Sequence, residues 1–405
     1  MQLFEPETLI QPFEFYQRVI LESPVAYDPE QNIYLVTSYE LVTAIVEDVE
    51  RFSSEFGELM NRVDEGDPEI KALLDEGFPR IHVLPSSDPP RHTRYRRLVS
   101  SAFTMPKVKK MEEEIERTVV ELIDDFADHG HCEFISAFAV KLLVMVIMRL
   151  LGAPEVPIEK AKAWSDAAID LLGGFATRER QIECLKLGNE AQHFFKAKID
   201  ERRADESIND MVASLVHAKS EDFEPLNDVE ILAVINSLMV AGNESTTATI
   251  GESVYHLTND GDGFERINSD PKLLNLLVEE LLRLATPVQG MWRIATCDVE
   301  VAGVTIPAGS MVHLRFATAN RDPKNFESPD SLEFDRKSAR SHLAFGKGAH
   351  VCVGNMLARK EIEISLRELS RRFTDIRMTS SDSISYQPNF LTRGPAELHI
   401  SFSPR

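Results

Sequence analysis

The chain has 405 residues, of which 43% are hydrophobic and 27% are charged, as is usual for a globular protein that folds in water. Its formal net charge of -22 excludes a broad basic surface, so we expect neither nucleic-acid binding nor attachment to an anionic membrane. The cysteines, Cys132, Cys184, Cys297 and Cys352, are scattered without a C-x-x-C pair, which argues against a disulfide framework and indicates a reducing, cytoplasmic setting.

The N-terminal part of the chain predicts a strand, a helix and then an irregular segment. The first residues, "MQLFEPETLIQPF", lack the basic start and the apolar core of a signal peptide. The stretch "NIYLVTSYELVTAIVED" predicts a short alternating strand followed by a helix that Ser38 caps. Residues 51–90 have weak periodicity and several prolines, which indicates a loop-rich region.

The middle of the chain is helical by its hydrophobic pattern. Apolar residues recur at helical spacing over residues 106–129, and further helices are expected as far as about residue 218. The most apolar stretch, residues 134–151, carries Lys141 and Arg149 and has the lower-limit length of a membrane span. We therefore expect a buried core helix there, and no membrane segment.

The second half predicts one long helix, shorter helices and several strands. Asn227 and Glu230 form a capping-box pattern that opens a helix to about residue 259, roughly 48 Å at 1.5 Å per residue. The stretches "DPKLLNLLVEELLRLAT" and "NMLARKEIEISLRELSRRF" predict helices, whereas residues 304–306 and the C-terminal end predict strands. Because no repeat or linker is present, we expect one domain over residues 1–405, mostly α with a minor β component.

Residues 344–354, "AFGKGAHVCVG", place three glycines, a histidine and a cysteine before a predicted helix. A phosphate cradle would need a Lys-Ser/Thr pair, which is missing. A buried structural cysteine is one remaining interpretation. The other is a thiolate ligand of a large metal cofactor, because a helix N-terminus stabilises the charge of Cys352 and glycines let the loop approach a flat macrocycle. These residues by themselves leave both interpretations open.

Five motifs in a fixed order resemble those of one family. The run Phe345-Gly346-x-Gly348-x-His350-x-Cys352-x-Gly354 resembles the haem-binding loop of the cytochrome P450 family. The other four are "DPPRHTRYRRLVSSAF" at 88–103, "AGNESTT" at 241–247, "EELLR" at 279–283 and "ANRDPKNFESPDSLEFDR" at 319–336. The resemblance covers nearly the whole chain. It implies the cytochrome P450 fold, with haem b between a long central helix and the helix after the cysteine loop.

The resemblance also implies which residues surround the haem. Cys352 is the expected ligand of the iron, and its thiolate would favour O–O cleavage. The other expected contacts are polar partners of the propionates or neighbours of the ring, namely His92, Arg96, Arg293, His350, Phe345, Gly346 and Ala241.

Glu280 and Arg283 lie one helical turn apart, a spacing that usually gives a surface ion pair of little energetic value. The resemblance implies instead a buried structural network that supports the cysteine loop. Its third partner is expected to be an arginine from residues 319–336, and Arg336 is the residue we assign to it.

The stretch "AGNESTT" lies inside the predicted long helix, where Gly242 costs about 1 kcal/mol relative to alanine. We expect a local bulge there that admits O2 and water. The resemblance makes Glu244 and Ser245 the acid–alcohol pair that delivers protons, with Thr246 as a third catalytic residue. Serine replaces the family's commoner threonine and lacks the methyl that stiffens the rotamer, so looser coupling of electrons to product is expected. A polar break without catalytic role is the alternative.

The reaction that the resemblance implies is monooxygenation of a small organic substrate by O2. Electrons are expected to come from NAD(P)H through a ferredoxin reductase and a ferredoxin, which would dock on a basic patch of an otherwise acidic, monomeric protein. The residues assigned to this patch are Lys347, Arg94, Lys107, Lys109 and Lys110.

The expected substrate is hydrophobic, such as a terpenoid, a steroid or an aromatic compound, because the assigned pocket residues are mostly apolar. We expect Gln289 to orient it through a hydrogen bond, and residues 52–85 to supply a lid. The assigned pocket residues are Val240, Val288, Gln289, Gly290, Met291, Phe390 and Leu391.

Two other functions are compatible with a haem site. A peroxide-driven haem peroxygenase would need no ferredoxin, but such relatives typically replace the acid–alcohol pair that Glu244 and Ser245 retain here. A non-catalytic haem protein that binds a gas would need neither that pair nor a substrate pocket.

Overall fold

The computed structural model describes residues 2–57, 63–100, 103–173, 176–380 and 382–405. They fall into two compact units. The first unit comprises residues 1–53, 110–142 and 244–405, and the second comprises residues 54–109 and 143–243. Three helices contribute residues to both units: α7 (Met105–Asp124), α8 (Val140–Leu150) and α12 (Asp228–Asp260). The expectation of one domain stays a prediction.

A five-stranded sheet forms one part of the first unit, in the order β1-β2-β8-β5-β3. Strands β2 and β8 are parallel, and the other neighbours are antiparallel. Its buried face is lined by apolar residues such as Val36, Val312 and Leu314, none of which is exposed to solvent. The strands are β1 (Val25–Asp28), β2 (Ile33–Val36), β3 (Phe52–Ser53), β5 (Met291–Ala295) and β8 (Met311–Leu314).

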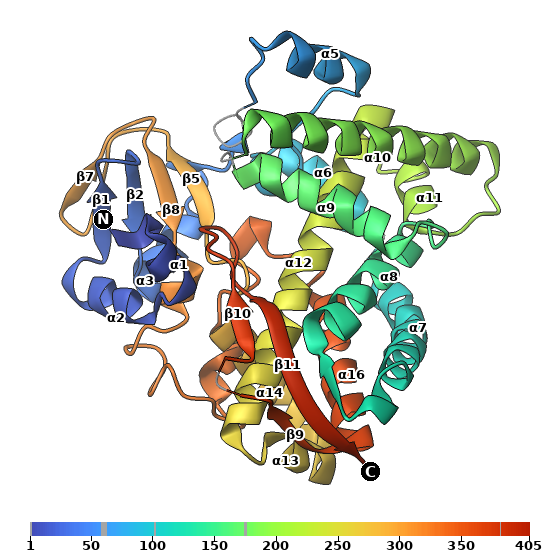
Figure 1. The fold of residues 1–405 in the computed structure, drawn as a ribbon. Helices are drawn as coiled ribbons and strands as arrows, with labels where there is room; N and C mark the ends of the chain where they lie inside the picture. Colours follow the sequence, from blue (N-terminus) through green and yellow to red (C-terminus); the bar gives the residue numbers. More distant parts are fainter. Residues whose placement is uncertain (1, 58–62, 101–102, 174–175, 381) are drawn as a thin grey trace. The chain divides into compact units, whose positions relative to one another are not determined.

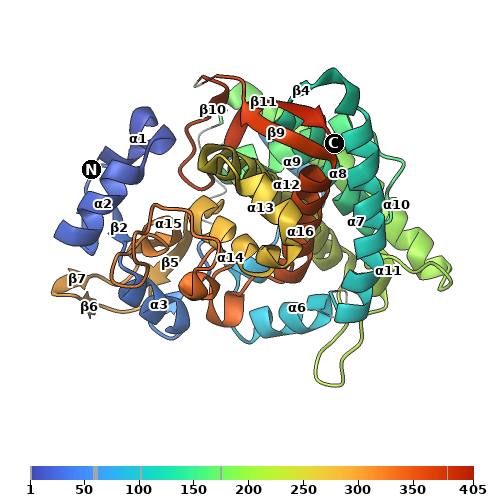
Figure 2. The same ribbon diagram turned by 90° about the horizontal axis from the view of Figure 1, so that it is seen from below.

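Helix α14 of the first unit is buried from Leu277 to Ala285 and contributes both apolar and charged side chains to the interior. In Figure 2, α16 runs beside α13, and α16 packs against both α13 and α14. The helices are α1 (Pro6–Ile10), α2 (Phe13–Glu22), α3 (Tyr39–Glu47), α13 (Gly263–Ser269), α14 (Leu274–Ala285), α15 (Phe316–Ala319) and α16 (Asn355–Arg372).

The C-terminal end of the chain forms a second sheet in the same unit. Its long strand β11 pairs with β10, β4 and β9, all antiparallel (Figure 1). A separate hairpin joins β6 to β7. The strands are β4 (His131–Glu133), β9 (Phe373–Met378), β10 (Ile384–Tyr386), β11 (Pro395–Pro404), β6 (Val299–Val301) and β7 (Val304–Ile306).

The second unit is helical. Helices α9 and α10 lie side by side in Figure 1, and α5 and α11 pack against α10. The ring of Trp164 of α9 packs at a tilt against Phe194 and edge-on against Phe195 of α10, and these contacts form part of this core. The helices are α5 (Pro68–Glu76), α6 (Arg91–Ser100), α9 (Ile158–Gly173), α10 (Arg178–Ala204) and α11 (Met211–Val216).

Most of the expected elements are confirmed. The backbone N–H of Leu41 donates to the Ser38 hydroxyl, and Asn227 and Glu230 accept each other's backbone N–H groups at the start of α12. Residues 51–90, however, are less irregular than expected, because Asp67 caps helix α5 by accepting two backbone N–H groups. The sequence prediction missed this cap because Asp67 lies in a segment rich in prolines and charged residues.

The apolar stretch 134–151 is a buried core segment, but it is not one uniform helix. A π-helical turn at Ile135–Ala139 precedes α8. In the parts of the chain that the structure describes, no helix combines the length and apolarity needed to cross a membrane.

Candidate functional site

The loop at 344–354 is shaped by two glycines and a short set of backbone hydrogen bonds. Gly346 and Gly348 have φ angles of 67° and 69°, a region that residues with a Cβ rarely adopt. The Cys352 N–H donates to the Phe345 carbonyl over 2.8 Å, which closes the loop on itself. Leu343 N–H donates to Asn320 Oδ1 over 2.7 Å and anchors the loop to the segment before it. Glycine geometry and these bonds together fix where Cys352 lies.

Cys352 lies three residues before Asn355, the first residue of α16. The Cys352 carbonyl accepts a hydrogen bond of 2.6 Å from the side chain of Asn355. The thiol is half-exposed, and a helix N-terminus favours a thiolate. Cys132 differs, because burial raises its thiol pKa to about 12. All four cysteines lie in described parts of the chain and carry thiols rather than disulfides, as the sequence predicted.

Phe345, which the sequence predicts beside the cysteine ligand, packs between a guanidinium group and an imidazole ring. The guanidinium of Arg359 lies 4.5 Å from the centre of its ring, and the His342 ring lies 5.7 Å away. Arg359 makes a two-pronged bond to Glu279, with Nε 2.6 Å from Oε1 and Nη2 3.0 Å from Oε2. This pair joins α16 to α14 behind the loop. Sequence reasoning missed it, although Glu279 belongs to the quoted "EELLR" motif.

His342 completes this second network. Its Nδ1 accepts the backbone N–H of Ala344 over 3.1 Å, so the proton of the neutral ring is on Nε2 and is donated to Glu279 over 3.1 Å. Burial lowers the pKa of His342, which keeps the ring neutral. Burial would raise the pKa of Glu279, but the hydrogen bonds from His342 and Arg359 outweigh it and lower that pKa to about 2.

One buried network joins Glu280, Arg283 and Arg336, and Arg336 is the third partner that we predicted for it. Arg283 Nε and Nη2 each lie 2.8 Å from a different carboxylate oxygen of Glu280. Arg336 Nε donates to Glu280 Oε1 over 2.9 Å. The exposed fractions of Glu280, Arg283 and Arg336 are 0%, 0% and 5%. Both arginines also donate to backbone carbonyls between residues 320 and 331, so the network holds the segment before the cysteine loop in one conformation.

Helix α12 passes through the "AGNESTT" stretch without interruption, so the expected bulge at Gly242 is wrong. The hydroxyl of Thr249 donates to the Ser245 carbonyl over 2.9 Å, and Ser253 donates to the Thr249 carbonyl over 2.6 Å. Hydroxyl bonds to the carbonyl four residues earlier often bend a helix, but α12 stays helical across residues 241–253. The polar residues here are therefore carried within the helix rather than at a break in it.

The predicted catalytic residues occupy successive positions of α12 in the first unit. Glu244 and Ser245 are half-buried, and Thr246 is buried. Glu244 Oε1 accepts a hydrogen bond of 3.0 Å from the hydroxyl of Thr392. In the second unit, the half-buried Val240 and the exposed Ala241 precede them on the same helix.

The side chain of Gln289 does not act as we expected. Its Oε1 accepts hydrogen bonds from Tyr16 over 2.5 Å and from Arg315 over 3.3 Å, and its Nε2 donates to the Thr286 carbonyl over 2.6 Å. The side chain is buried, with 2% exposed. Its amide is therefore occupied by the protein, which contradicts the expectation that it orients a substrate.

The other pocket residues assigned in the first unit differ in burial. Val288, Met291 and Leu391 are half-buried apolar residues. Gly290 is buried, and a Cβ at this position would lie 2.2 Å from the Leu314 carbonyl oxygen, so a larger residue does not fit there. The ring of Phe390 stacks on Phe4 with 4.6 Å between ring centres, so it packs into the interior. The assigned lid includes residues 58–62, which lie outside the described residues.

The residues assigned to the haem propionates belong to different units. Arg293 in the first unit is buried on β5, and its Nη1 donates to the Trp292 carbonyl, while His350 is half-exposed. In the second unit, His92 is buried and Arg96 is half-buried, four residues apart on α6.

Arg94, assigned to a ferredoxin-docking patch, is engaged elsewhere within the second unit. Its Nη1 and Nη2 lie 2.5 Å and 2.9 Å from the two carboxylate oxygens of Glu230, and only 19% of its side chain is exposed. A two-pronged bond of this kind holds the guanidinium away from a partner protein. The structure thus contradicts this member of the patch.

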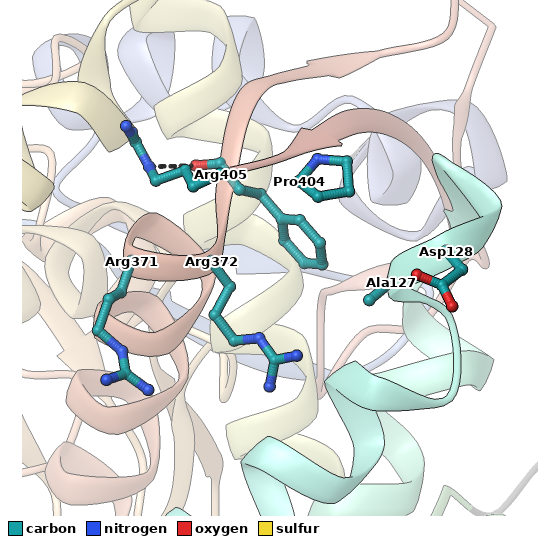
Figure 3. A pocket seen from close by; sticks show the side chains of 7 residues that line it. Ala127, Asp128, Arg371, Arg372, Pro404 and Arg405 are labelled. Atoms are coloured by element: carbon teal, nitrogen blue, oxygen red, sulfur yellow. Dashed lines mark hydrogen bonds between the residues drawn. The ribbon is translucent and has the colours of Figure 1, made fainter.

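A surface pocket of about 400 Å³ lies at the end of α16 in the first unit and contains none of the predicted site residues (Figure 3). Its arginines are paired within the protein. Arg371 binds Glu368, Arg372 binds Asp124, and Arg405 binds Glu265. Among the described residues, moreover, no three histidine, cysteine or acidic side chains converge as a metal site.

Three comparisons relate this chain to known proteins. The family model for cytochrome P450 matches residues 176–398. The putative cytochrome P450 YjiB of Bacillus subtilis (strain 168) is 32% identical over 372 residues, which is 91% of this chain and 89% of that protein. The 6-deoxyerythronolide B hydroxylase of Saccharopolyspora erythraea is 32% identical over 377 residues, 91% and 90% of the two chains. The solved structure of CYP109E1 from Bacillus megaterium in complex with corticosterone has a TM-score of 0.84 and 32% identity, covering 98% of this chain and 99% of that one.

Proposed function

This chain belongs to the cytochrome P450 family and is a monooxygenase that uses haem b, and we propose that it oxidises a hydrophobic organic molecule with electrons from a ferredoxin. The balanced reaction consumes one substrate C–H bond, O2, two electrons and two protons, and it gives the alcohol and water. The observation that carries the proposal is the loop in which two left-handed glycines hold Cys352 at the start of α16.

The residues of this loop fit a haem. We assign the Cys352 thiolate as the ligand of the iron, since it is half-exposed and lies where a helix N-terminus favours its charge. When bound, the haem supplies the chemistry of O–O cleavage. The buried Arg293 and the half-exposed His350 are assigned to the propionates, because guanidinium and imidazole groups suit carboxylates. His92 and Arg96 keep the same role as predicted by the resemblance.

Proton delivery is assigned to α12. Glu244 is the acid that takes protons from solvent, and the Ser245 hydroxyl passes them on toward the reacting oxygen. The two side chains are neighbours in sequence and both are half-buried, which suits a path between solvent and the interior. Thr246, which is buried, is assigned a supporting role. The network of Glu280, Arg283 and Arg336 is assigned to the support of the cysteine loop.

The electron donor is proposed to be an NAD(P)H-reduced ferredoxin that binds near the cysteine loop. Lys347 lies in that loop, where it pairs with Glu47 over 3.1 Å, and 42% of its side chain is exposed. Exposed lysines steer acidic partners even on an acidic protein. Lys109 and Lys110 are exposed as well. The patch is proposed without Arg94, which binds Glu230. We propose a cytoplasmic monomer, consistent with the four thiols.

The substrate is proposed to be a bulky hydrophobic molecule of the macrolide or steroid kind. One relative is named as a 6-deoxyerythronolide B hydroxylase, and the CYP109E1 structure contains corticosterone. Val288, Met291 and Leu391 are apolar and half-buried, which suits a hydrophobic ligand. Because the amide of Gln289 is occupied, no polar group from that residue is expected to orient the substrate.

The first experiment is the difference spectrum of the dithionite-reduced protein with and without carbon monoxide. The wild type and the control C297S, which changes an exposed cysteine, are expected to give the strongly red-shifted Soret band of a thiolate-ligated ferrous haem. C352S is expected to lose that band. A wild-type band at the position of a histidine- or thiol-ligated haem would refute the assignment of Cys352.

A second experiment distinguishes the donors. Product formation from a steroid and macrolide panel is measured with a ferredoxin, its reductase and NADPH, and in parallel with hydrogen peroxide alone. The proposal expects the ferredoxin system to support turnover better than peroxide. Equal turnover with peroxide would favour the peroxygenase. Absence of product with both, together with a red-shifted carbon monoxide band, would favour the non-catalytic gas-binding protein.

A further inference from the structure

The acid on α12 is held by a hydroxyl from the C-terminal end of the chain. Thr392 Oγ1 donates to Glu244 Oε1 over 3.0 Å, although the two residues are 148 positions apart. Both side chains are half-buried and belong to the first unit. A hydrogen bond to an ionised carboxylate is among the stronger ones, and it limits the rotamers that a flexible glutamate side chain can adopt.

The loop that carries Thr392, residues 389–395, lies along one face of α12. Glu244, Ala248 and Glu252 follow one another at intervals of four residues, which places them on the same side of the helix. Gly394 lies so close to Ala248 that an added Cβ would be 2.3 Å from the Ala248 Cβ. Arg393 Nη1 lies 2.6 Å from Glu252 Oε1 in a buried ion pair. The loop therefore contacts three successive turns of α12.

The same loop is tied on its other side to residues 287–289. Arg393 N–H donates to the Pro287 carbonyl over 2.9 Å, and Gln289 N–H donates to the Leu391 carbonyl over 2.8 Å. Asn389 Oδ1 accepts the N–H groups of Leu391 and Thr392, which fixes the turn. Val288 and Leu391, the assigned pocket residues, are thus in one backbone network with the residue that holds Glu244.

We infer that Thr392 is a positioning residue that sets the orientation of the Glu244 carboxylate for proton delivery, and that the loop 389–395 couples this carboxylate to the pocket segment. The inference rests on the proposed function, in which Glu244 is the acid. Its second part follows from the geometry: a ligand that moves Val288 or Leu391 moves the backbone of Thr392, and with it the hydroxyl that holds the acid. No bond forms or breaks in this step; only the hydrogen bond from Thr392 to Glu244 is made or lost.

Three variants test the inference. T392V removes the hydroxyl and keeps the branched shape, whereas T392S restores a hydroxyl. T374V is the matched control, because Thr374 on β9 donates to the carboxylate of Glu265 over 3.1 Å and so loses a bond of the same kind at a different carboxylate. The first readout is the infrared carboxylate band of Glu244, assigned by its disappearance in E244Q. It needs no turnover, and it is expected to shift in T392V, return in T392S and stay unchanged in T374V.

The second readout is product formed per NADPH consumed, with the ferredoxin system and a substrate found in the panel. In T392V the product formed per NADPH is expected to fall about tenfold, which corresponds to the lower values for the free energy of a hydrogen bond to an ionised group. The peroxide released per NADPH is expected to rise accordingly. T392S is expected to recover most of the loss, and T374V to match the wild type. The carbon monoxide band of all three variants is expected to stay at the wild-type position.

An unchanged Glu244 band in T392V would overturn the inference, whatever the turnover. A shifted band with unchanged coupling would overturn the role in proton delivery, and so would an equal loss in T374V. Failure of the proposed function looks different: the wild type itself would form no product with a ferredoxin, while the infrared comparison would still report on the bond between Thr392 and Glu244.

Discussion

Replacing Arg283 by lysine keeps the charge but removes the geometry of the buried network. Arg283 donates two hydrogen bonds to Glu280 and three to the carbonyls of Asn320, Pro329 and Ser331. A lysine has three N–H donors at a single atom, so at least two of these five bonds lose their donor. Each buried acceptor left without a donor costs about 1–3 kcal/mol. Glu280 Oε1 and the Ser331 carbonyl keep bonds from Arg336, so the acceptors that depend on Arg283 are Glu280 Oε2 and the carbonyls of Asn320 and Pro329. A single ammonium group cannot reach all three, and with one acceptor left without a donor we expect R283K to lower the free energy of unfolding by about 1–3 kcal/mol, out of the about 5–15 kcal/mol that a folded protein has.

The measurement is denaturant unfolding of the haem-loaded protein, followed by far-ultraviolet circular dichroism. R178K is the control, because Arg178 pairs with Asp67 and Glu69 at a site where 49% of its side chain is exposed. That variant is expected to stay within about 0.5 kcal/mol of the wild type. If R283K were as stable as R178K, the hydrogen bonds counted around Arg283 would not support the fold as reasoned.

Two further changes follow from the same structure. Glu279 is ionised well below its usual range, since its pKa is about 2 against 4.5, although burial opposes this and the bonds from His342 and Arg359 favour it. The stability that the ionised Glu279 contributes is fully present above about pH 4.5 and is lost as the pH falls toward 2, and it is on the order of 3 kcal/mol. We expect E279Q to make the free energy of unfolding less dependent on pH across that window. A pH dependence as steep as that of the wild type would contradict this prediction. G394A is expected to lower the melting temperature, because its Cβ would overlap α12, at a cost of about 1–3 kcal/mol. G188A, inside α10 with only an arginine end 3.6 Å from the added atom, is expected to raise the melting temperature by stabilising the fold by about 0.5–1 kcal/mol. A lower melting temperature in both variants would argue against the packing at Gly394.

Features that depend on neighbours in the chain could be predicted from the sequence. The start of α12 follows from Asn227 and Glu230, which cap one another three residues apart. The turn geometry of the cysteine loop follows from Gly346 and Gly348, because few other residues take a positive φ. The resemblance to one family supplied what local patterns could not, including the assignment of Arg336 to Glu280, 56 residues away.

Two other sequence predictions failed: one gave a bulge that the structure lacks, and one missed a short helix. The bulge expected at Gly242 is absent from α12, where the hydroxyls of Thr249 and Ser253 bond within the helix. Helix α5 was missed because its cap, Asp67, lies in a segment rich in prolines and charges. At α5, composition was a weaker guide than the hydrogen bonds of one capping side chain.

By itself, the sequence determined the family and the long helix, and it supplied the cysteine proposed for the haem and the proposed acid–alcohol pair, since these depend on motifs and on residues a few positions apart. The tertiary structure alone decided which of the assigned polar groups are already engaged. Gln289 is bound by Tyr16, 273 residues away, and Glu244 is bound by Thr392, 148 residues away. Such partners meet only when the packing of the core brings distant segments together, and no periodicity or spacing in the chain encodes that meeting.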